Sequence, residues 1–197
     1  MQKIFDTLVD SYLLNKIGLA DHFLSPMLSS QLKNNLLNLY QRDTMHYAGT
    51  GNLESIQLDA KVRGDQIYWL DRSHDDIFEN EFFDLMDRFV QYLNSSCYTG
   101  ITGYEFHYTL YEKGSFYRKH LDQFKTDKSR AYSMIMYLNE NWEAEDGGEL
   151  CIHHAAHQQR ISPQSGKSVF FKSDELEHEV LLTNTSRMSI TGWLKVG

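Results

Sequence analysis

The sequence has few cysteines, no long apolar run and no excess of basic residues. Its 197 residues include two cysteines, Cys97 and Cys151, too few for a disulfide-rich extracellular scaffold and more typical of a reducing compartment. No segment approaches the roughly 20 apolar residues of a membrane span, and the first residues lack the apolar core and cleavage site of a signal peptide. We therefore expect a cytoplasmic protein that makes no membrane contact.

The charge balance also excludes an obvious class of partner. The net charge is -8, which argues against nucleic acid, because non-specific nucleic-acid binding depends on clustered lysine and arginine. Hydrophobic residues make up 41% of the chain, enough for a packed core, and no repeat or linker-like tract interrupts it. The sequence predicts one domain over residues 1–197, with largely helical support and a substrate loop in 1–95 and a β core in 96–197.

Two segments of the first half have helical periodicity. In residues 25–40, Ser25 is an expected N-cap and Pro26 occupies the first helical position, where its missing N–H is not needed. Residues 77–94 repeat the pattern with aromatic and leucine side chains on one face. We expect both helices to support a sheet.

After Gly100 the pattern changes to a period of two. In "YEFHYTLY", Tyr104, Phe106, Tyr108 and Leu110 would face one side, with the intervening residues on the other. Further short strands are predicted in residues 131–138, 168–172, 178–182 and 187–196. Many short strands without intervening helices predict a mainly β sandwich or barrel with supporting helices.

The stretch "YRKHLDQF" contains a candidate metal motif. His120 and Asp122 are separated by one residue, so in a strand both side chains would point to the same side. His178 follows 58 residues after His120. Two imidazoles and one carboxylate form the facial triad of non-haem Fe(II) oxygenases, which leaves coordination positions open for other ligands.

Arg187 follows on the next predicted strand and suits the cosubstrate of such a site. 2-Oxoglutarate chelates iron through two oxygens and carries a second carboxylate at its far end. A guanidinium group binds a carboxylate through two parallel charge-assisted hydrogen bonds. The combination of His120, Asp122, His178 and Arg187 therefore predicts an iron and 2-oxoglutarate site.

A second histidine-rich stretch, "IHHAAHQQR", leaves an alternative open. His153 and His157 would share one face if this stretch were helical, and with His154 they offer several imidazoles. The preceding residues, however, predict a strand that enters a loop, where solvated histidines are common. The role of these three histidines stays undecided on the sequence alone.

Longer stretches resemble a known family. The segments "YEKGSFYRKHLD", "YSMIMYLNENWEAEDGGELCI", "SVFFKSDELEHEV" and "RMSITGW" are similar to the Fe(II)/2-oxoglutarate-dependent prolyl 4-hydroxylases, in particular to the hypoxia-inducible-factor prolyl hydroxylase branch and its bacterial relatives. "RGDQIYWLD" resembles the segment before the return strand of the branch's substrate-covering loop. The resemblance covers about residues 50–196. It implies a double-stranded β-helix, the jelly roll of cupin-like proteins.

The resemblance also implies roles for individual residues. His120, Asp122 and His178 would be the catalytic metal ligands. Arg187 and Tyr137 would bind the far carboxylate of 2-oxoglutarate. The remaining implied cofactor-pocket residues are Tyr111, Thr191 and Ile135, and the implied substrate-side residues are Asp65, Arg130 and Trp193, with Asp65 and Arg130 as a pair that links the substrate loop to the barrel.

The implied activity is hydroxylation of a prolyl residue in a protein or peptide. Fe(II) would be the cofactor, 2-oxoglutarate and dioxygen would be consumed, and succinate and CO2 would be released. Ascorbate would serve as the reductant. The loop in residues 46–65 would close over the substrate. Substrate identity stays open, because residues 112–119 and "HHAAHQQR" depart from the animal enzymes where a substrate would approach. The alternatives are hydroxylation of free proline or another small molecule, and a non-enzymatic jelly-roll module that binds or senses a ligand.

Overall fold

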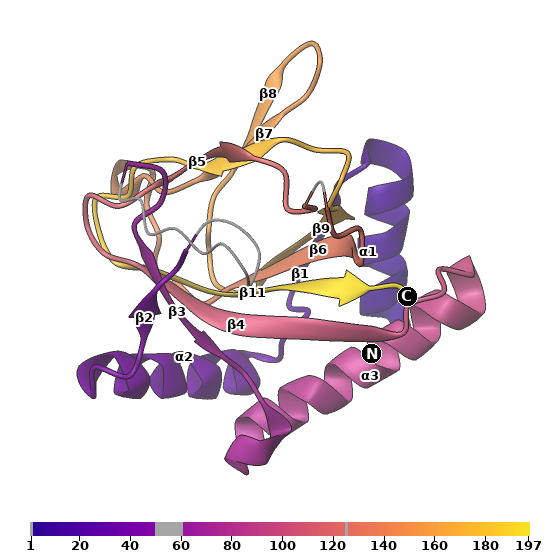
Figure 1. Cartoon of the computed structure of the whole chain (residues 1–197), viewed down its shortest axis with the longest axis horizontal. Coiled ribbons are helices and arrows are strands. Elements are labelled where there is room, and N and C mark those ends of the chain that lie inside the picture. The colour runs from indigo at the N-terminus through magenta and orange to yellow at the C-terminus, as the bar shows by residue number, and fades with distance from the viewer. Residues whose placement is uncertain (1, 50–60, 125) are drawn as a thin grey trace.

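The computed structural model describes residues 2–49, 61–124 and 126–197. In this part of the chain, two antiparallel sheets and three α-helices make up most of the regular structure (Figure 1). The helices are α1 (Gln2–Asn15), α2 (Pro26–Gln41) and α3 (Ile77–Cys97). None of the helices in these ranges is long and apolar enough to cross a membrane.

The larger sheet has the strand order β1-β9-β6-β11-β4-β3-β2. Its strands are β1 (Gly18–Asp21), β2 (His46–Tyr47), β3 (Asp65–Trp69), β4 (Gly103–Tyr111), β6 (Arg130–Tyr137), β9 (Lys167–Lys172) and β11 (Arg187–Lys195). The smaller sheet, in the order β5-β10-β7-β8, contains β5 (Tyr117–His120), β7 (Leu150–His153), β8 (Gln158–Ile161) and β10 (His178–Val180). Short 3-10 turns lie at η1 (Arg72–His74) and η2 (Ala144–Asp146).

Each predicted helix forms close to its expected bounds. The Ser25 hydroxyl accepts a hydrogen bond from the Leu28 backbone N–H at 3.1 Å, and Pro26 begins the helix. This is the arrangement expected for an N-cap followed by proline. At α3 the Asp76 carboxylate caps the helix through the N–H groups of Phe78 and Glu79.

Alternation along the central strands separates the core from the site. In β4, Phe106, Tyr108 and Leu110 join the hydrophobic cluster that packs against the helices, as the period-two pattern predicts. The intervening His107, Thr109 and Tyr111 line a cavity on the opposite face. The same strand thus supports the helices with one face and builds the site with the other.

A second cluster joins the two sheets. Ile135 and Val169 of the larger sheet pack with Leu150, Ile152 and Val180 of the smaller sheet. The sheets therefore face one another across an apolar layer, as in a jelly roll. Strands in the first half, such as β1, were not predicted, because four residues are too few to show a period. Gly18 fits there because a Cβ would lie 2.6 Å from the Leu8 carbonyl oxygen of α1.

Candidate metal centre and adjoining pocket

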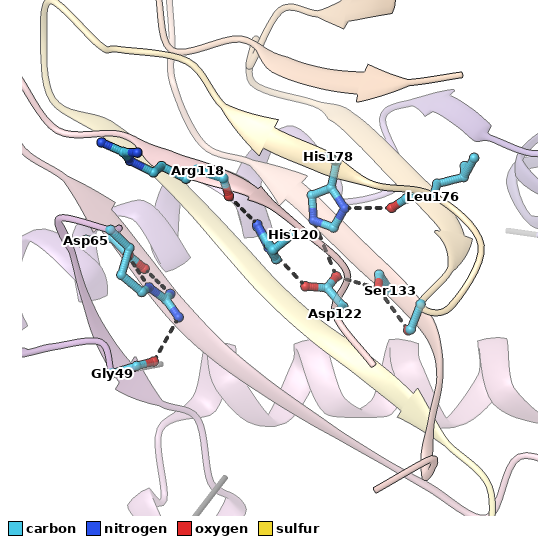
Figure 2. Close-up of polar contacts among 10 residues, drawn as sticks. Gly49, Asp65, Arg118, His120, Asp122, Ser133, Leu176 and His178 are labelled. Carbon is cyan, nitrogen blue, oxygen red and sulfur yellow. Dashed lines mark hydrogen bonds and ion pairs between the residues drawn. The ribbon is translucent and has the colours of Figure 1, made fainter. Parts of the chain in front are cut away.

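The register of β5 and β10 brings the predicted metal ligands together. His178 lies opposite His120 in the antiparallel pair, and Asp122 follows just after β5 ends. His120 Nε2 is 3.4 Å from Asp122 Oδ1, and His178 Nε2 is 3.6 Å from Asp122 Oδ2 (Figure 2). One possible ligand atom from each residue lies within 4.8 Å of the other two, so a single ion could contact all three.

Backbone carbonyls orient both imidazoles. His120 Nδ1 lies 2.7 Å from the Arg118 carbonyl oxygen, and His178 Nδ1 lies 3.0 Å from that of Leu176. A carbonyl oxygen can only accept, so each Nδ1 carries the proton and each Nε2 keeps its lone pair. Both free lone pairs lie on the side of Asp122. A histidine that binds a metal through Nε2 requires this tautomer, with the proton on Nδ1.

Asp122 is held as an ionised carboxylate by its neighbours. Burial alone would raise the pKa of Asp122, but its neighbours His178 and His120 and the Ser133 hydroxyl together hold it well below the usual range. Ser133 Oγ donates to Asp122 Oδ2 at 2.6 Å (Figure 2), and Ser173 Oγ lies 2.9 Å from Ser133 Oγ. Burial lowers the pKa of His178, which favours its neutral form. The donor set is one carboxylate and two imidazoles whose Nδ1 atoms face carbonyl oxygens, which fits a divalent iron ion.

A stack of side chains supports His120. The Tyr117 ring lies parallel to the His120 ring, with centroids 3.6 Å apart, and the Arg63 guanidinium lies 4.2 Å from the Tyr117 centroid. Asp65 holds Arg63 through two hydrogen bonds of 2.7 and 2.6 Å. Sequence reasoning assigned no role to Arg63, Tyr117 or Ser133. The spacing of Arg63 and Asp65 could have indicated their contact, because residues two apart in an extended segment face the same side.

A cavity of about 620 Å³ adjoins the three ligands. Arg187 lines it, is only 2% exposed, and donates from Nε to the Gly148 carbonyl oxygen at 2.8 Å. Its guanidinium carbon lies 5.1 Å from the ring centroids of both Tyr111 and Tyr137. No carboxylate in the described parts of the chain forms an ion pair with Arg187. A buried positive charge without a counter-ion is unfavourable, so this end of the cavity is built for an anion.

The two tyrosines beside Arg187 are neutral donors. Burial raises the pKa of Tyr137 to about 12, against the opposing charge of Arg187, and burial raises that of Tyr111 well above its usual value. The Tyr137 hydroxyl has no hydrogen-bond partner among the residues described. A buried hydroxyl normally has one, so a ligand oxygen is its expected acceptor.

Three further predicted residues also line the cavity. Ile135 and Trp193 are 6% and 8% exposed and provide apolar wall. The Thr191 hydroxyl lies 3.2 Å from that of Ser189. The structure therefore places Ile135, Thr191 and Trp193 in the same cavity as Arg187.

The expected pair of Asp65 and Arg130 is not formed. Both residues line the cavity, but Asp65 bonds Arg63, and Arg130 pairs with Glu105 at 2.9 Å. Arg130 also lies over the Trp193 ring, 3.3 Å from its centroid. Each charge has a closer partner, which explains the difference: Arg63 lies two residues before Asp65, and Glu105 lies on β4, across β11 from Arg130. Of the predicted substrate loop, residues 50–60 lie outside the described residues.

The histidine-rich stretch does not form the alternative site. β7 ends at His153 and a hairpin follows, so His153 and His157 do not share a helical face. The rings of His154 and His157 stack at 4.4 Å instead. His153 lies near Cys151 and Glu179.

The sequence and the structure each match known proteins. The 2OG-Fe(II) oxygenase superfamily matches residues 106–195. Prolyl hydroxylase EGLN3 of Mus musculus is 29% identical over 152 residues, covering 67% of this chain and 58% of that protein, and the Homo sapiens protein matches to the same extent. The chain thus spans little more than half the length of these curated relatives.

Solved structures match over nearly the whole chain. A Pseudomonas putida prolyl-4-hydroxylase has a TM-score of 0.87 and 31% identity, covering 98% of this chain and 99% of that one. A Trichoplax adhaerens prolyl hydroxylase, in complex with a hypoxia inducible factor oxygen degradation domain peptide fragment, has a TM-score of 0.86 and 23% identity, covering 98% and 90%.

These neighbours confirm the predicted double-stranded β-helix with supporting helices. They also confirm the resemblance drawn from the sequence motifs, because the match to the bacterial enzyme combines nearly full coverage with 31% identity. The name of the family states the iron and the cosubstrate that its members use. The chain belongs to the 2OG-Fe(II) oxygenase superfamily.

Proposed function

We propose that this protein is an Fe(II)- and 2-oxoglutarate-dependent dioxygenase that hydroxylates a prolyl residue in a protein or peptide. The observation that carries the proposal is Arg187, a buried guanidinium without a carboxylate partner among the described residues, in the same cavity as His120, Asp122 and His178. A dicarboxylate that chelates a metal at one end needs this arrangement: a metal site and a separate cationic site in one cavity.

Each residue of the cavity has a defined task in this proposal. His120, Asp122 and His178 hold Fe(II) on one side and leave its other positions open. Arg187 binds the far carboxylate of 2-oxoglutarate, and the Tyr137 hydroxyl donates a second hydrogen bond to it. Because burial raises the pKa of Tyr137 to about 12, this hydroxyl keeps its proton throughout the neutral range.

When bound, iron and 2-oxoglutarate supply the oxidising chemistry, in which dioxygen is consumed, 2-oxoglutarate becomes succinate and CO2, and one oxygen atom enters a C–H bond of the substrate. The protein positions these groups and excludes water. Ile135, Trp193 and Leu150 contribute apolar surface to the cavity, which limits solvent at the reacting atoms.

The substrate assignment rests on the relatives and on the shape of the cavity. All four relatives described above are named prolyl hydroxylases, and the Trichoplax adhaerens protein was solved with a peptide bound. Trp69 is 40% exposed and lines the cavity together with Tyr47, which is 57% exposed. Exposed aromatic side chains at a cavity edge suit an extended, proline-containing segment.

An anaerobic optical titration tests the cofactor assignment first. Adding Fe(II) and then 2-oxoglutarate should produce a visible metal-to-ligand charge-transfer band, and His178→Ala should lose it. The absence of a band at saturating concentrations of both would favour a non-enzymatic binding module. Mass spectrometry of proline-containing peptides then tests the substrate class, with one added oxygen as the expected product. Stimulation by free proline alone would favour the small-molecule alternative.

Arg187→Ala gives the sharpest quantitative prediction. Truncating one partner of a buried charge pair costs about 2–5 kcal/mol, so the 2-oxoglutarate concentration at half saturation should rise by about 30-fold or more. Fe(II) binding should change little, because Arg187 is not one of the three grouped ligands.

Arg42→Ala is the control for that change, because Arg42 lies at the exposed C-terminal end of α2. Its half-saturation concentration should equal that of the wild type. An unchanged 2-oxoglutarate requirement in Arg187→Ala would remove Arg187 from the cosubstrate site.

Two further features complete the proposal. We propose ascorbate as a reductant that restores Fe(II), and its omission should shorten the period of linear turnover. We also propose a cytoplasmic location, which is supported by the two unpaired cysteines, Cys97 and Cys151.

A further inference from the structure

A second group of potential metal ligands lies on the outer face of the smaller sheet. Cys151, His153 and Glu179 each offer one ligand atom, and the three atoms lie within 4.8 Å of one another. The register explains the grouping: Cys151 on β7 lies opposite Glu179 on β10, and His153 is two residues along β7 on the same face. The group is preassembled by strand pairing.

This group is separate from the candidate iron centre. In β10, His178 faces the space between the sheets and Glu179 faces the other way, since neighbouring residues of a strand alternate. The partners show the same alternation: His178 lies opposite Ile152, which belongs to the core between the sheets, and Glu179 lies opposite Cys151. β7 continues into the hairpin that projects at the top of Figure 1.

We propose that Cys151, His153 and Glu179 form a binding site for a zinc ion, with water as the fourth ligand. Thiolate, imidazole and carboxylate are the three ligand types that zinc accepts, and sulfur disfavours magnesium and calcium. This site goes beyond the proposed dioxygenase function and does not depend on it.

The distances suit a tetrahedral ion. With zinc bond lengths of about 2.0 to 2.3 Å, the ligand atoms should lie about 3.3–3.6 Å apart. His153 Nε2 and Glu179 Oε1 are 2.9 Å apart, and no separation in the group exceeds 4.8 Å. Side-chain movements of about an ångström therefore complete the geometry.

The protons can be accounted for. Burial and the charge of Glu179 raise the pKa of the Cys151 thiol, so without metal the sulfur is protonated, and zinc binding releases that proton to solvent. The proton on His153 Nε2, which now bonds Glu179, moves to Nδ1. The Gln158 side chain lies 3.3 Å from Nδ1, and its amide can turn from donor to acceptor to follow the change.

An ion can reach the site from solvent. The side chains of His153 and Glu179 are 19% and 28% exposed, while Cys151 is buried. The exposed Arg160 of β8 lies opposite Cys151 and lowers the pKa of its thiol. Its positive charge opposes a bound cation, so Arg160→Gln should strengthen binding.

Cobalt(II) is the test probe, because it replaces zinc and gives visible bands. The 197-residue chain, kept reduced with a phosphine, is titrated with cobalt(II) under nitrogen. The expected result is a sulfur-to-cobalt charge-transfer band in the near ultraviolet, removed by added zinc. Sulfur makes the signal specific, because the iron-site group of His120, Asp122 and His178 contains none.

Matched variants decide the outcome. Cys151→Ala should abolish the sulfur band, and His153→Gln and Glu179→Gln should each weaken cobalt binding by more than about tenfold, since even partners outside a ligand set change metal affinity 10- to 100-fold. Cys97→Ser, His157→Gln and Asp122→Ala should retain the band. Circular dichroism confirms that each variant is folded.

Two results would overturn the proposal. One is the absence of a sulfur band at saturating cobalt(II) in folded wild-type protein. The other is an unchanged cobalt(II) affinity in both His153→Gln and Glu179→Gln, or a band that disappears in Cys97→Ser, either of which would assign the signal to adventitious thiol binding. Neither result would affect the charge-transfer band of iron and 2-oxoglutarate at the other site.

Discussion

At the scale of single residues, Ser133 determines the direction of a candidate metal ligand. Its hydroxyl donates to Asp122 Oδ2 at 2.6 Å, and the buried Ser173 supports it from β9's end at 2.9 Å. The Asp122 carboxylate has a second oxygen that faces His120 at 3.4 Å. Serine thus fixes the oxygen that lies 3.6 Å from His178 Nε2, and the other oxygen is left facing His120.

Ser133→Ala should weaken Fe(II) binding by about 10- to 100-fold, the usual effect of losing a partner that orients a metal ligand. The affinity for 2-oxoglutarate measured at saturating iron should change much less. Ser168→Ala is the matched control, because Ser168 is also a buried strand serine and its side chain makes no hydrogen bond within the described residues. Equal iron affinity in Ser133→Ala and wild type would show that Asp122 needs no such support.

At the scale of secondary-structure elements, Gly192 fixes how closely β11 and β4 approach. A Cβ at this position would overlap the Glu105 carbonyl oxygen and the Phe106 ring. β11 lies between β4 and β6 in the larger sheet, and it carries Arg187 and Trp193 into the cavity. A shift of this strand would therefore disturb the packed helices and the cavity at once.

Gly192→Ala should lower the free energy of unfolding by about 1–3 kcal/mol or more, as overpacking of a close-packed interior does. Gly103→Ala on β4 is the control, since a Cβ there meets nothing within 4 Å. Urea unfolding of both variants measures the difference in midpoint. Similar midpoints for the two would show that the sheet can widen at Gly192 without loss.

At the scale of the whole molecule, a buried histidine links stability to pH. Burial lowers the pKa of His107 to about 4, while in the unfolded chain it returns to about 6.5. Below about pH 6.5 the unfolded state takes up a proton that the folded state does not, so the free energy of unfolding falls as the pH falls. The loss approaches about 3 kcal/mol near pH 4.

His107→Gln removes this contribution and can keep the contact with the Thr109 hydroxyl, which lies 2.9 Å from His107 Nδ1. Its unfolding free energy should therefore fall less steeply between about pH 6.5 and 4 than that of the wild type. His157→Gln, an exposed hairpin histidine, should follow the wild type. Parallel curves for His107→Gln and wild type would contradict the assignment.

The sequence predicted the alternating strands and the grouping of His120, Asp122 and His178 better than the charge pairs. The alternation of apolar residues in β4 and the spacing of His120 and Asp122 both follow from the geometry of an extended backbone. This geometry is local, so it can be recognised from the sequence. The partner of Arg130 was predicted wrongly, because Glu105 lies beside it only when β6 and β4 pair with opposite edges of β11. Cys151 and Glu179 likewise meet through the pairing of β7 and β10. Local sequence patterns do not show which strands pair, so this contact could not be predicted.

The alternation in β4, β6 and β11 has a consequence for how this protein can change over evolutionary time. Met188 and Ile190 pack toward the helices, while Arg187 and Thr191 line the cavity. Deleting one residue from such a strand would exchange the two sets. Substitutions can therefore reshape the cavity gradually, but changes of chain length are restricted to strand ends and to connections such as the hairpin between β7 and β8.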